Sequence, residues 1–150
     1  MPMARFFLIA LLCATGLFAD LPRPVMAQQS VEFEPAACMF ELPAGVVEGR
    51  DVDCGWLRVP ERHARPDGTS IRLAVAIIRT KVVNPALDPL VMLQGGPGGS
   101  TIDTYMQVIF APGSRLNNLN RDIILFDQRG TLYSEPSLIC NEQFDLVEQT

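Results

Sequence analysis

Leu93-Gln94-Gly95-Gly96-Pro97-Gly98-Gly99-Ser100 is the stretch that decides the fold. It completes the apolar run of residues 89–93, and a second loop, Asp127-Gln128-Arg129-Gly130, follows the apolar run of residues 123–126. Two buried parallel strands that end at the same edge of a sheet, each followed by a loop, produce this pattern. The sequence therefore predicts an α/β fold in which the two loops shape one site.

The residues before the glycine loop predict an antiparallel hairpin. Residues 52–59 alternate as in a strand, Pro66-Asp67-Gly68 has turn chemistry, and residues 71–78 return as a second strand. One face of the first strand carries Val52, Cys54, Trp56 and Arg58. Residues 32–49, which contain two prolines, predict irregular chain.

The residues after the glycine loop predict a helix and a further strand. Residues 101–110 carry apolar side chains at helical spacing, and Ser100 or Thr101 is placed to cap the helix, with Asp103 in its first turn. These apolar side chains are Ile102, Tyr105, Met106 and Ile109. Residues 122–126 then predict a buried strand. The order hairpin, strand, helix, strand predicts a mixed sheet that turns parallel.

Residues 1–27 have the pattern of a secretory signal peptide. Arg5 precedes the apolar run 6–18, and Val25-Met26-Ala27 provides the small residue expected before the cleavage site. The run is too short and too poorly flanked for a membrane span, although an uncleaved anchor is the alternative. We expect an exported protein, periplasmic or extracellular, with no stable membrane anchor and with a domain formed by residues 28–150.

Three cysteines follow residue 27, and in an exported protein they indicate disulfides rather than metal ligands. Cys38 and Cys54 flank a loop with glycine and proline, and closing a ring of that size is worth about 3 kcal/mol. Cys140 is then unpaired. Its partner lies beyond Thr150, or it is a free buried thiol.

The composition argues against several other functions. The formal net charge of −5 at pH 7 disfavours nucleic acid and anionic membranes as partners. His63, the only histidine, falls in a charged hairpin loop and is expected to be solvated. It has no metal-ligand spacing with the aspartates, so we predict no metal and no cofactor.

Glycines around Pro97 free the backbone to turn sharply and let N–H groups approach a ligand. Such amides can stabilise the oxyanion of an acyl-transfer reaction, at about 3–4 kcal/mol per donor. A phosphate cradle is less well supported, because no Lys-Ser or Lys-Thr follows the loop, and the glycine spacing of a dinucleotide site is absent. A tight turn that binds nothing is the remaining alternative.

Together these motifs resemble the proline iminopeptidase and tripeptidyl aminopeptidase-like branch of the α/β-hydrolases. The resemblance rests on the glycine loop, on Asp127-Gln128-Arg129-Gly130 and on Ser134-Glu135-Pro136-Ser137-Leu138-x-Cys140. Residues 54–61 also resemble the first long strand of the secreted members. The resemblance runs from about Cys38 to Cys140.

The resemblance implies that the backbone amides of Gly95 and Gly96 form half of an oxyanion hole. The other residues that it assigns to active-site loops are Gln94, Pro97, Gly98, Gly99, Asp127, Arg129 and Gly130. Asp127 and Arg129 are expected to brace their loop through a buried ion pair. Contact of Arg129 with the substrate is the alternative.

The chain departs from this family pattern at two positions and in length. Gln94 stands where many proline iminopeptidases have histidine, and Leu132 stands where glycine is frequent. No serine has the Gly-x-Ser-x-Gly setting of a nucleophile, and the triad follows the order serine, acid, histidine in this fold. The triad is therefore expected beyond Thr150, and these 150 residues alone are expected to be inactive.

The resemblance thus implies the N-terminal half of an exported serine hydrolase. Its activity would be that of a peptidase releasing N-terminal residues or short peptides, with a peptide or ester as substrate. Two alternatives remain open. One is a small secreted binding or inhibitory protein with a disulfide. The other is an α/β-hydrolase with different chemistry, such as an esterase or an epoxide or haloalkane hydrolase.

Overall fold

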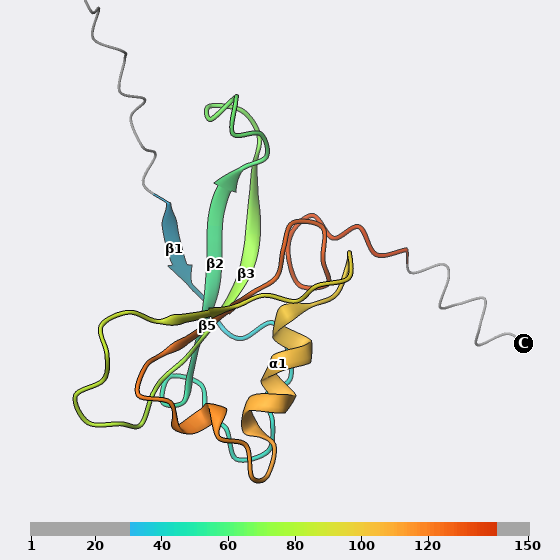
Figure 1. The fold of residues 1–150 in the computed structure, drawn as a ribbon. Helices are drawn as coiled ribbons and strands as arrows, with labels where there is room; N and C mark the ends of the chain where they lie inside the picture. The colour runs from blue at the N-terminus through green and yellow to red at the C-terminus, as the bar shows by residue number, and fades with distance from the viewer. Residues whose placement is uncertain (1–30, 141–150) are drawn as a thin grey trace, which may run out of the picture.

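A five-stranded mixed sheet with one α-helix against it forms the structure (Figure 1). In this computed structural model the described residues are 31–140, so the predicted signal peptide lies outside them. The strand order is β1-β2-β3-β5-β4. This arrangement is that of a partial α/β fold, as the sequence predicts at this level.

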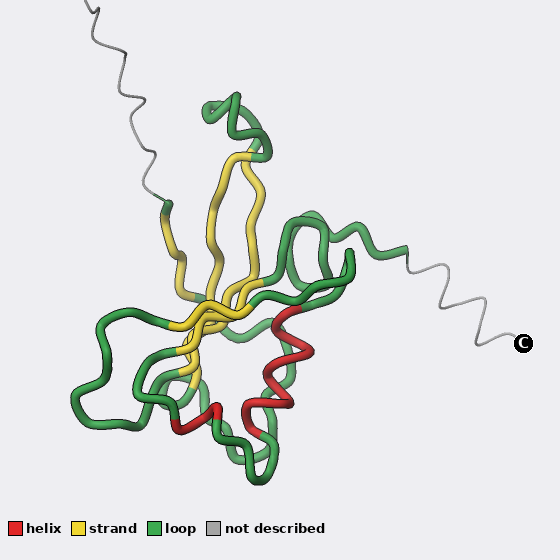
Figure 2. Tube along the Cα trace, viewed as in Figure 1, coloured by secondary structure: helices red, strands yellow, loops and turns green. Residues whose placement is uncertain are grey.

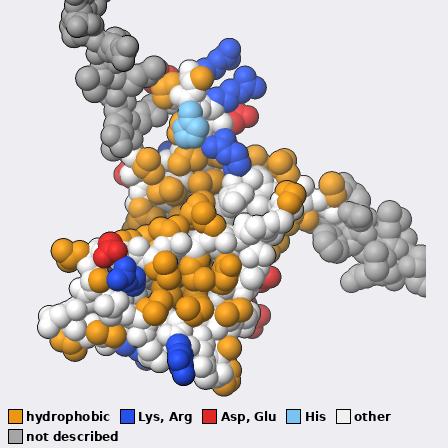
Figure 3. Space-filling view, in the orientation of Figure 1, with side chains coloured by type: hydrophobic (Ala, Val, Ile, Leu, Met, Phe, Trp, Pro, Cys, Tyr) orange, Lys and Arg blue, Asp and Glu red, His pale blue; other side chains and the backbone are white. Residues whose placement is uncertain are grey.

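The predicted hairpin is the longest part of the sheet. Strands β2 (Val52–Pro60) and β3 (Ser70–Ile78) pair antiparallel, from Val52 opposite Ile78 to Pro60 opposite Ser70. The hairpin prediction is therefore confirmed, with strand ends within one residue of those expected. Its tip projects beyond the rest of the described residues (Figures 1 and 2), and basic side chains gather there (Figure 3).

The prediction of irregular chain over residues 32–49 is wrong at its start. Glu32–Pro35 forms β1, which pairs antiparallel with β2. The strand is only four residues long and ends in proline, so its sequence pattern is too weak to predict it. Strand β1 approaches β2 closely at Gly55, because this residue has no side chain. The ring of Phe33 covers Gly55 instead.

The second half of the sheet has the predicted strand, helix, strand order. Strand β4 (Leu90–Met92) leads through helix α1 (Thr101–Phe110) and the 3₁₀ turn η1 (Leu116–Asn118) to β5 (Ile123–Phe126). Strand β5 pairs antiparallel with β3 and parallel with β4. The expected change from antiparallel to parallel pairing is confirmed.

The core lies between the sheet and α1. Ile102, Met106 and Ile109 of the helix are buried, as their spacing predicts, and Tyr105 is half-buried. They pack with one face of the sheet: Val52, Cys54, Ala74, Ala76, Ile78, Ile123 and Leu125. Partly buried residues of the loop before β2 also pack against this core: Cys38, Met39, Phe40, Leu42 and Val46.

Burial of β4 on both faces, as its continuous apolar run predicts, is not found in the described part of the chain. Val91 is 50% exposed, and Leu93 just after the strand is 57% exposed. The physical reason is position, since β4 is the last strand in the sheet order. Within residues 31–140 no helix is long and apolar enough to cross a membrane.

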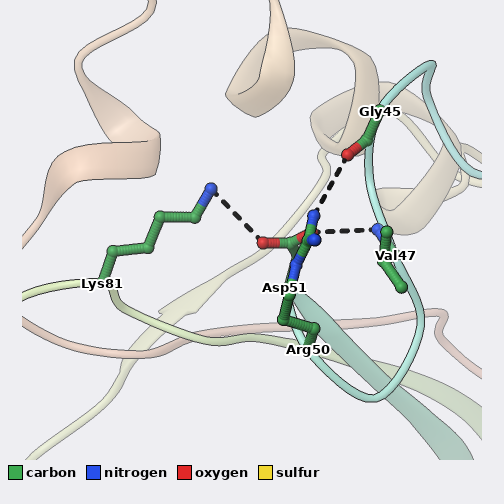
Figure 4. A network of polar contacts seen from close by, with 5 residues as sticks. All are labelled: Gly45, Val47, Arg50, Asp51 and Lys81. Carbon is green, nitrogen blue, oxygen red and sulfur yellow. Dashed lines mark hydrogen bonds and ion pairs between the residues drawn. The ribbon is translucent and has the colours of Figure 1, made fainter.

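The loop before β2 is closed by a disulfide and by a buried carboxylate. Cys38 and Cys54 form the disulfide. Asp51, 3% exposed, accepts hydrogen bonds from the Val47 amide at 2.9 Å and from the Arg50 guanidinium at 2.7 Å, while Lys81 Nζ lies 3.3 Å away (Figure 4). The Arg50 hydrogen bond, followed by that from the Val47 amide, lowers the pKa of Asp51 to about 2. This network lies at the end of the sheet where β2 begins.

Candidate active site at the carboxyl ends of β4 and β5

The two predicted loops meet. Strands β4 and β5 run parallel, with Met92 opposite Leu125, so the residues that follow them leave the sheet at the same edge. The contact between the loops is direct, because Ser100 Oγ donates a hydrogen bond to Asp127 Oδ1 at 2.9 Å. The structure thus brings together the two motifs on which the sequence argument rests.

The glycine loop is held at both of its ends. The Gln94 amide donates to Thr101 Oγ1 at 3.2 Å, which closes the base of the loop. Ser100, rather than Thr101, is the N-cap of α1, and its hydroxyl accepts from the Asp103 amide at 2.9 Å. Gly99 packs beneath the Gln94 side chain, since a Cβ there would lie 2.9 Å from Gln94 Cγ.

The tip of the loop is open. Gly95 and Gly96 are exposed, and none of the acceptors in the described residues bonds to their amides. Gly96 has φ +67° and Gly98 has φ +91°, the left-handed region that glycine adopts without strain. Amides of exposed residues that bond to no acceptor within residues 31–140, on a loop with a closed base, can donate to an oxygen of a bound molecule.

Asp127 does not form the expected ion pair with Arg129. Its side chain is fully buried, and it accepts from the Ser100 hydroxyl, the Ile102 amide at 3.1 Å and the Tyr133 amide at 3.2 Å. The Ser100 and Ile102 donors lie at the start of α1, and the Tyr133 amide lies in the turn after β5. The sequence prediction missed them, because a hydroxyl and two backbone amides carry no charge and leave no charge pattern in the sequence.

Arg129 points to the hairpin instead. Its Nη1 donates to the Glu61 carbonyl oxygen at 2.6 Å, and its side chain is exposed. A pocket of about 310 Å³ lies here between the hairpin and the loop after β5. Its lining is Glu61, Thr69, Ser70, Ile71, Arg129, Gly130, Pro136 and Leu138. Gly130 has φ +81°, and Leu138 packs against it.

Two residues of this region were not among the predicted site residues. Ser134 is 1% exposed, donates through its hydroxyl to the Asp127 carbonyl at 2.8 Å, and accepts from the Ala74 amide at 3.1 Å. Burial raises the pKa of Tyr133, and the charges of Asp103 and Asp127 raise it further. Ser134 opens the third motif of the family resemblance, whereas only closeness to Asp127 in the sequence could have indicated Tyr133.

The surroundings of α1 disfavour a phosphate cradle. The buried carboxylate of Asp127 already occupies the N-terminal end of the helix, where a bound anion would otherwise be stabilised. The only lysine of the chain, Lys81, is paired with Asp51 at the other end of the sheet. Across residues 31–140, no cluster of histidine, cysteine and acidic side chains is arranged to hold a metal ion.

The remaining candidates lie outside this site. His63 is exposed in the hairpin loop, as its sequence setting predicts. Among residues 31–140, Cys140 is exposed and forms no disulfide.

Comparison with known proteins identifies relatives that are hydrolases. Serine protease Hip1 of Mycobacterium tuberculosis is 32% identical over 138 residues, which cover 92% of this chain and 25% of that protein. Tripeptidyl aminopeptidase of Streptomyces coelicolor is 31% identical over 124 residues, covering 81% of this chain and 22% of that protein. The chain belongs to this peptidase-like α/β-hydrolase family.

A third relative extends the family beyond peptidases. Carboxylesterase B of Mycobacterium tuberculosis is 34% identical over 109 residues, covering 70% of this chain and 20% of that protein. The chain spans between a fifth and a quarter of the length of these three relatives. No family model matches the chain. The resemblance stated from the sequence motifs is confirmed at the level of the family.

Proposed function

We propose that this chain is the N-terminal part of an exported serine hydrolase that releases N-terminal residues or short peptides from peptide substrates. Its residues 28–150 would begin an α/β-hydrolase domain and supply the oxyanion loop. The serine, acid and histidine of the triad would lie in sequence beyond Thr150. The activity, the substrate class and the extent of the whole protein are parts of this proposal.

The observation that carries the proposal is that the glycine loop has a fixed base and two amides without an acceptor at its tip, within the described residues. The amides of Gly95 and Gly96, at the carboxyl end of β4, bond to no acceptor in the described part of the chain, while Gln94 and Ser100 hold the loop at its base. When a serine attacks a carbonyl carbon, negative charge develops on the carbonyl oxygen, and two preorganised amides would stabilise it. A further donor, completing the oxyanion hole, is expected from the residue that follows the nucleophile.

Two observations support the remaining parts of the proposal. The Cys38–Cys54 disulfide fits an oxidising compartment, and therefore export guided by residues 1–27. The named relatives include a serine protease and a tripeptidyl aminopeptidase, which favours a peptidase over a small binding or inhibitory protein. Carboxylesterase B makes ester hydrolysis the second candidate.

The test uses the full-length native protein purified from its source cells. It would be assayed on tripeptidyl, dipeptidyl and aminoacyl nitroanilides, on the same peptides with a blocked amino terminus, and on short-chain nitrophenyl esters. We expect cleavage of the unblocked peptides, loss of cleavage with the blocked ones, and labelling by a fluorophosphonate of a serine outside residues 1–150. Efficient turnover of esters alone would favour the esterase. Hydrolysis of none of these substrates would refute the proposed function.

A further inference from the structure

The charge of Asp127 has no cationic partner among the described residues. Its carboxyl group is fully buried, and its hydrogen bonds there come from the Ser100 hydroxyl and from the amides of Ile102 and Tyr133. Arg129, two residues away, is bonded to Glu61 instead. The charge is therefore stabilised by the Ser100 hydroxyl and the Ile102 amide at the start of α1, by the Tyr133 amide, and by the helix dipole. Each of these donors has a defined direction, so the carboxylate holds its neighbours in one geometry.

Ser100 transmits this geometry to the glycine loop. Its hydroxyl hydrogen is directed to Asp127 Oδ1, and its oxygen accepts from the Asp103 amide, so the side chain is oriented on both sides. Ser100 is also the last residue of the loop whose other end is closed by the bond from the Gln94 amide to Thr101. The position of the Gly95 and Gly96 amides relative to β5 therefore depends on the Asp127–Ser100 bond.

We infer that Asp127 is a positioning residue for the reaction, acting through Ser100 to aim the Gly95 and Gly96 amides at the developing oxyanion. This inference rests on the proposed function. Asp127 touches neither substrate nor reacting atoms, and its effect is to fix donors that do. A displacement of such donors by about 1 Å is enough to cost about 10²-fold in rate.

A second buried carboxylate provides the matched control. Asp51 is 3% exposed and also accepts a hydrogen bond from a backbone amide. It lies just before β2, however, and forms no hydrogen bond with a residue of the glycine loop. Asp51→Asn and Asp127→Asn make the same chemical change in equally buried places. We expect both substitutions to lower stability, whereas only Asp127→Asn alters the hydrogen bond that supports the glycine loop.

The experiment compares Asp127→Asn, Ser100→Ala, Ser100→Thr and Asp51→Asn in the full-length protein, with kcat and KM on its best substrate. Binding of a peptide boronic acid, which forms a tetrahedral adduct with the nucleophile, reports on oxyanion stabilisation. We expect Asp127→Asn and Ser100→Ala to lower kcat by about 10²-fold with KM changed less than about threefold, and to weaken boronate binding in parallel. Ser100→Thr keeps the hydroxyl and should restore kcat to within about fivefold.

The result that would overturn the inference is an equal loss of kcat in Asp51→Asn, or a loss in Asp127→Asn that falls on KM alone. If the unaltered protein hydrolyses nothing, the proposed function fails, and the positioning of the loop is decided by amide hydrogen exchange. Faster exchange across residues 95–99 in Asp127→Asn than in Asp51→Asn would support the structural part of the inference. Equal exchange in the two variants would refute that part as well.

Discussion

The aromatic rings of Phe40 and Tyr133 lie 5.6 Å apart between their centroids, at an interplanar angle of 49°. Phe40 belongs to the ring closed by the Cys38–Cys54 disulfide, and the Tyr133 amide donates to Asp127. The disulfide-closed loop therefore reaches the turn that supports the candidate active site. We therefore expect the disulfide, by limiting the motion of Phe40, to limit the motion of Tyr133 as well.

Removal of the disulfide by Cys38→Ala with Cys54→Ala should lower the free energy of unfolding by about 3 kcal/mol, because the unfolded chain gains the freedom of the opened ring. Amide exchange should also rise at residues 131–134, through the lost support of Phe40. Urea denaturation and hydrogen-exchange mass spectrometry of the full-length protein measure the two effects. Cys140→Ala is the control and should change neither, whereas faster exchange confined to residues 38–54 would contradict the coupling.

Gly96→Ala should impair catalysis by moving the amide that it carries. At φ +67° a side chain costs about 1–2 kcal/mol, so the loop is expected to relax away from this conformation. We expect kcat to fall by about 10²-fold. Gly113→Ala is the matched control, since Gly113 has φ +81°, follows the far end of α1, and would place a Cβ where no other atom lies within 4 Å. Steady-state kinetics that show the same loss in both variants would exclude a specific role for Gly96.

Asp51 should make stability depend on pH in the acid range. Its pKa is about 2 in the folded protein, below the ordinary value of 3.8, so the unfolded chain takes up the proton first as pH falls. The stabilisation is complete above about pH 4 and is lost between there and about pH 2. Asp51→Asn should flatten this part of the stability curve, as measured by denaturant unfolding at a series of pH values. An unchanged slope would show that other carboxyl groups account for it.

Arg72 should contribute more to stability than its acidic partner Glu135. Its guanidinium lies 4.5 Å from the centre of the Trp56 ring and also donates to Glu135 through Nε at 2.9 Å. The two ion-pair side chains are 38% and 52% exposed, so a double-mutant cycle should give a coupling below about 1 kcal/mol that weakens in salt. Arg72→Ala should cost about 0.5–1 kcal/mol more than Glu135→Ala, through the lost contact with the ring. Equal costs would show that stacking contributes nothing.

The elements that could be predicted from the sequence are those with a strong period. The alternation from Val52 and the helical spacing from Ile102 predict β2 and α1 closely, because burial of one face leaves a repeating pattern. Two things could not be predicted. Strand β1 has too few residues for a pattern. Two of the three partners of Asp127 are backbone amides, from the first turn of α1 and from the turn after β5, and their positions depend on the tertiary fold.

The same limit explains the error at Arg129. Two opposite charges separated by one residue suggest an ion pair, but residues i and i+2 in a turn are directed by its backbone rather than by their mutual attraction. Gly130, at φ +81°, reverses the chain here, and the Arg129 side chain reaches the Glu61 carbonyl in the hairpin loop. The meeting of the two loops at one edge of the sheet was predictable, whereas their internal bonding was not.

Gly55 has a consequence for the behaviour of the protein in concentrated solution. Strand β1 covers part of the outer edge of β2, and its short length, its terminal proline and its two glutamates discourage a strand of another molecule from adding there. This cover depends on the absence of a side chain at Gly55, where a Cβ would lie 2.4 Å from the Glu34 carbonyl oxygen. A single methyl group at that position would push β1 away and expose the hydrogen-bonding backbone of β2. The expected consequence is aggregation of the protein rather than a lower catalytic rate.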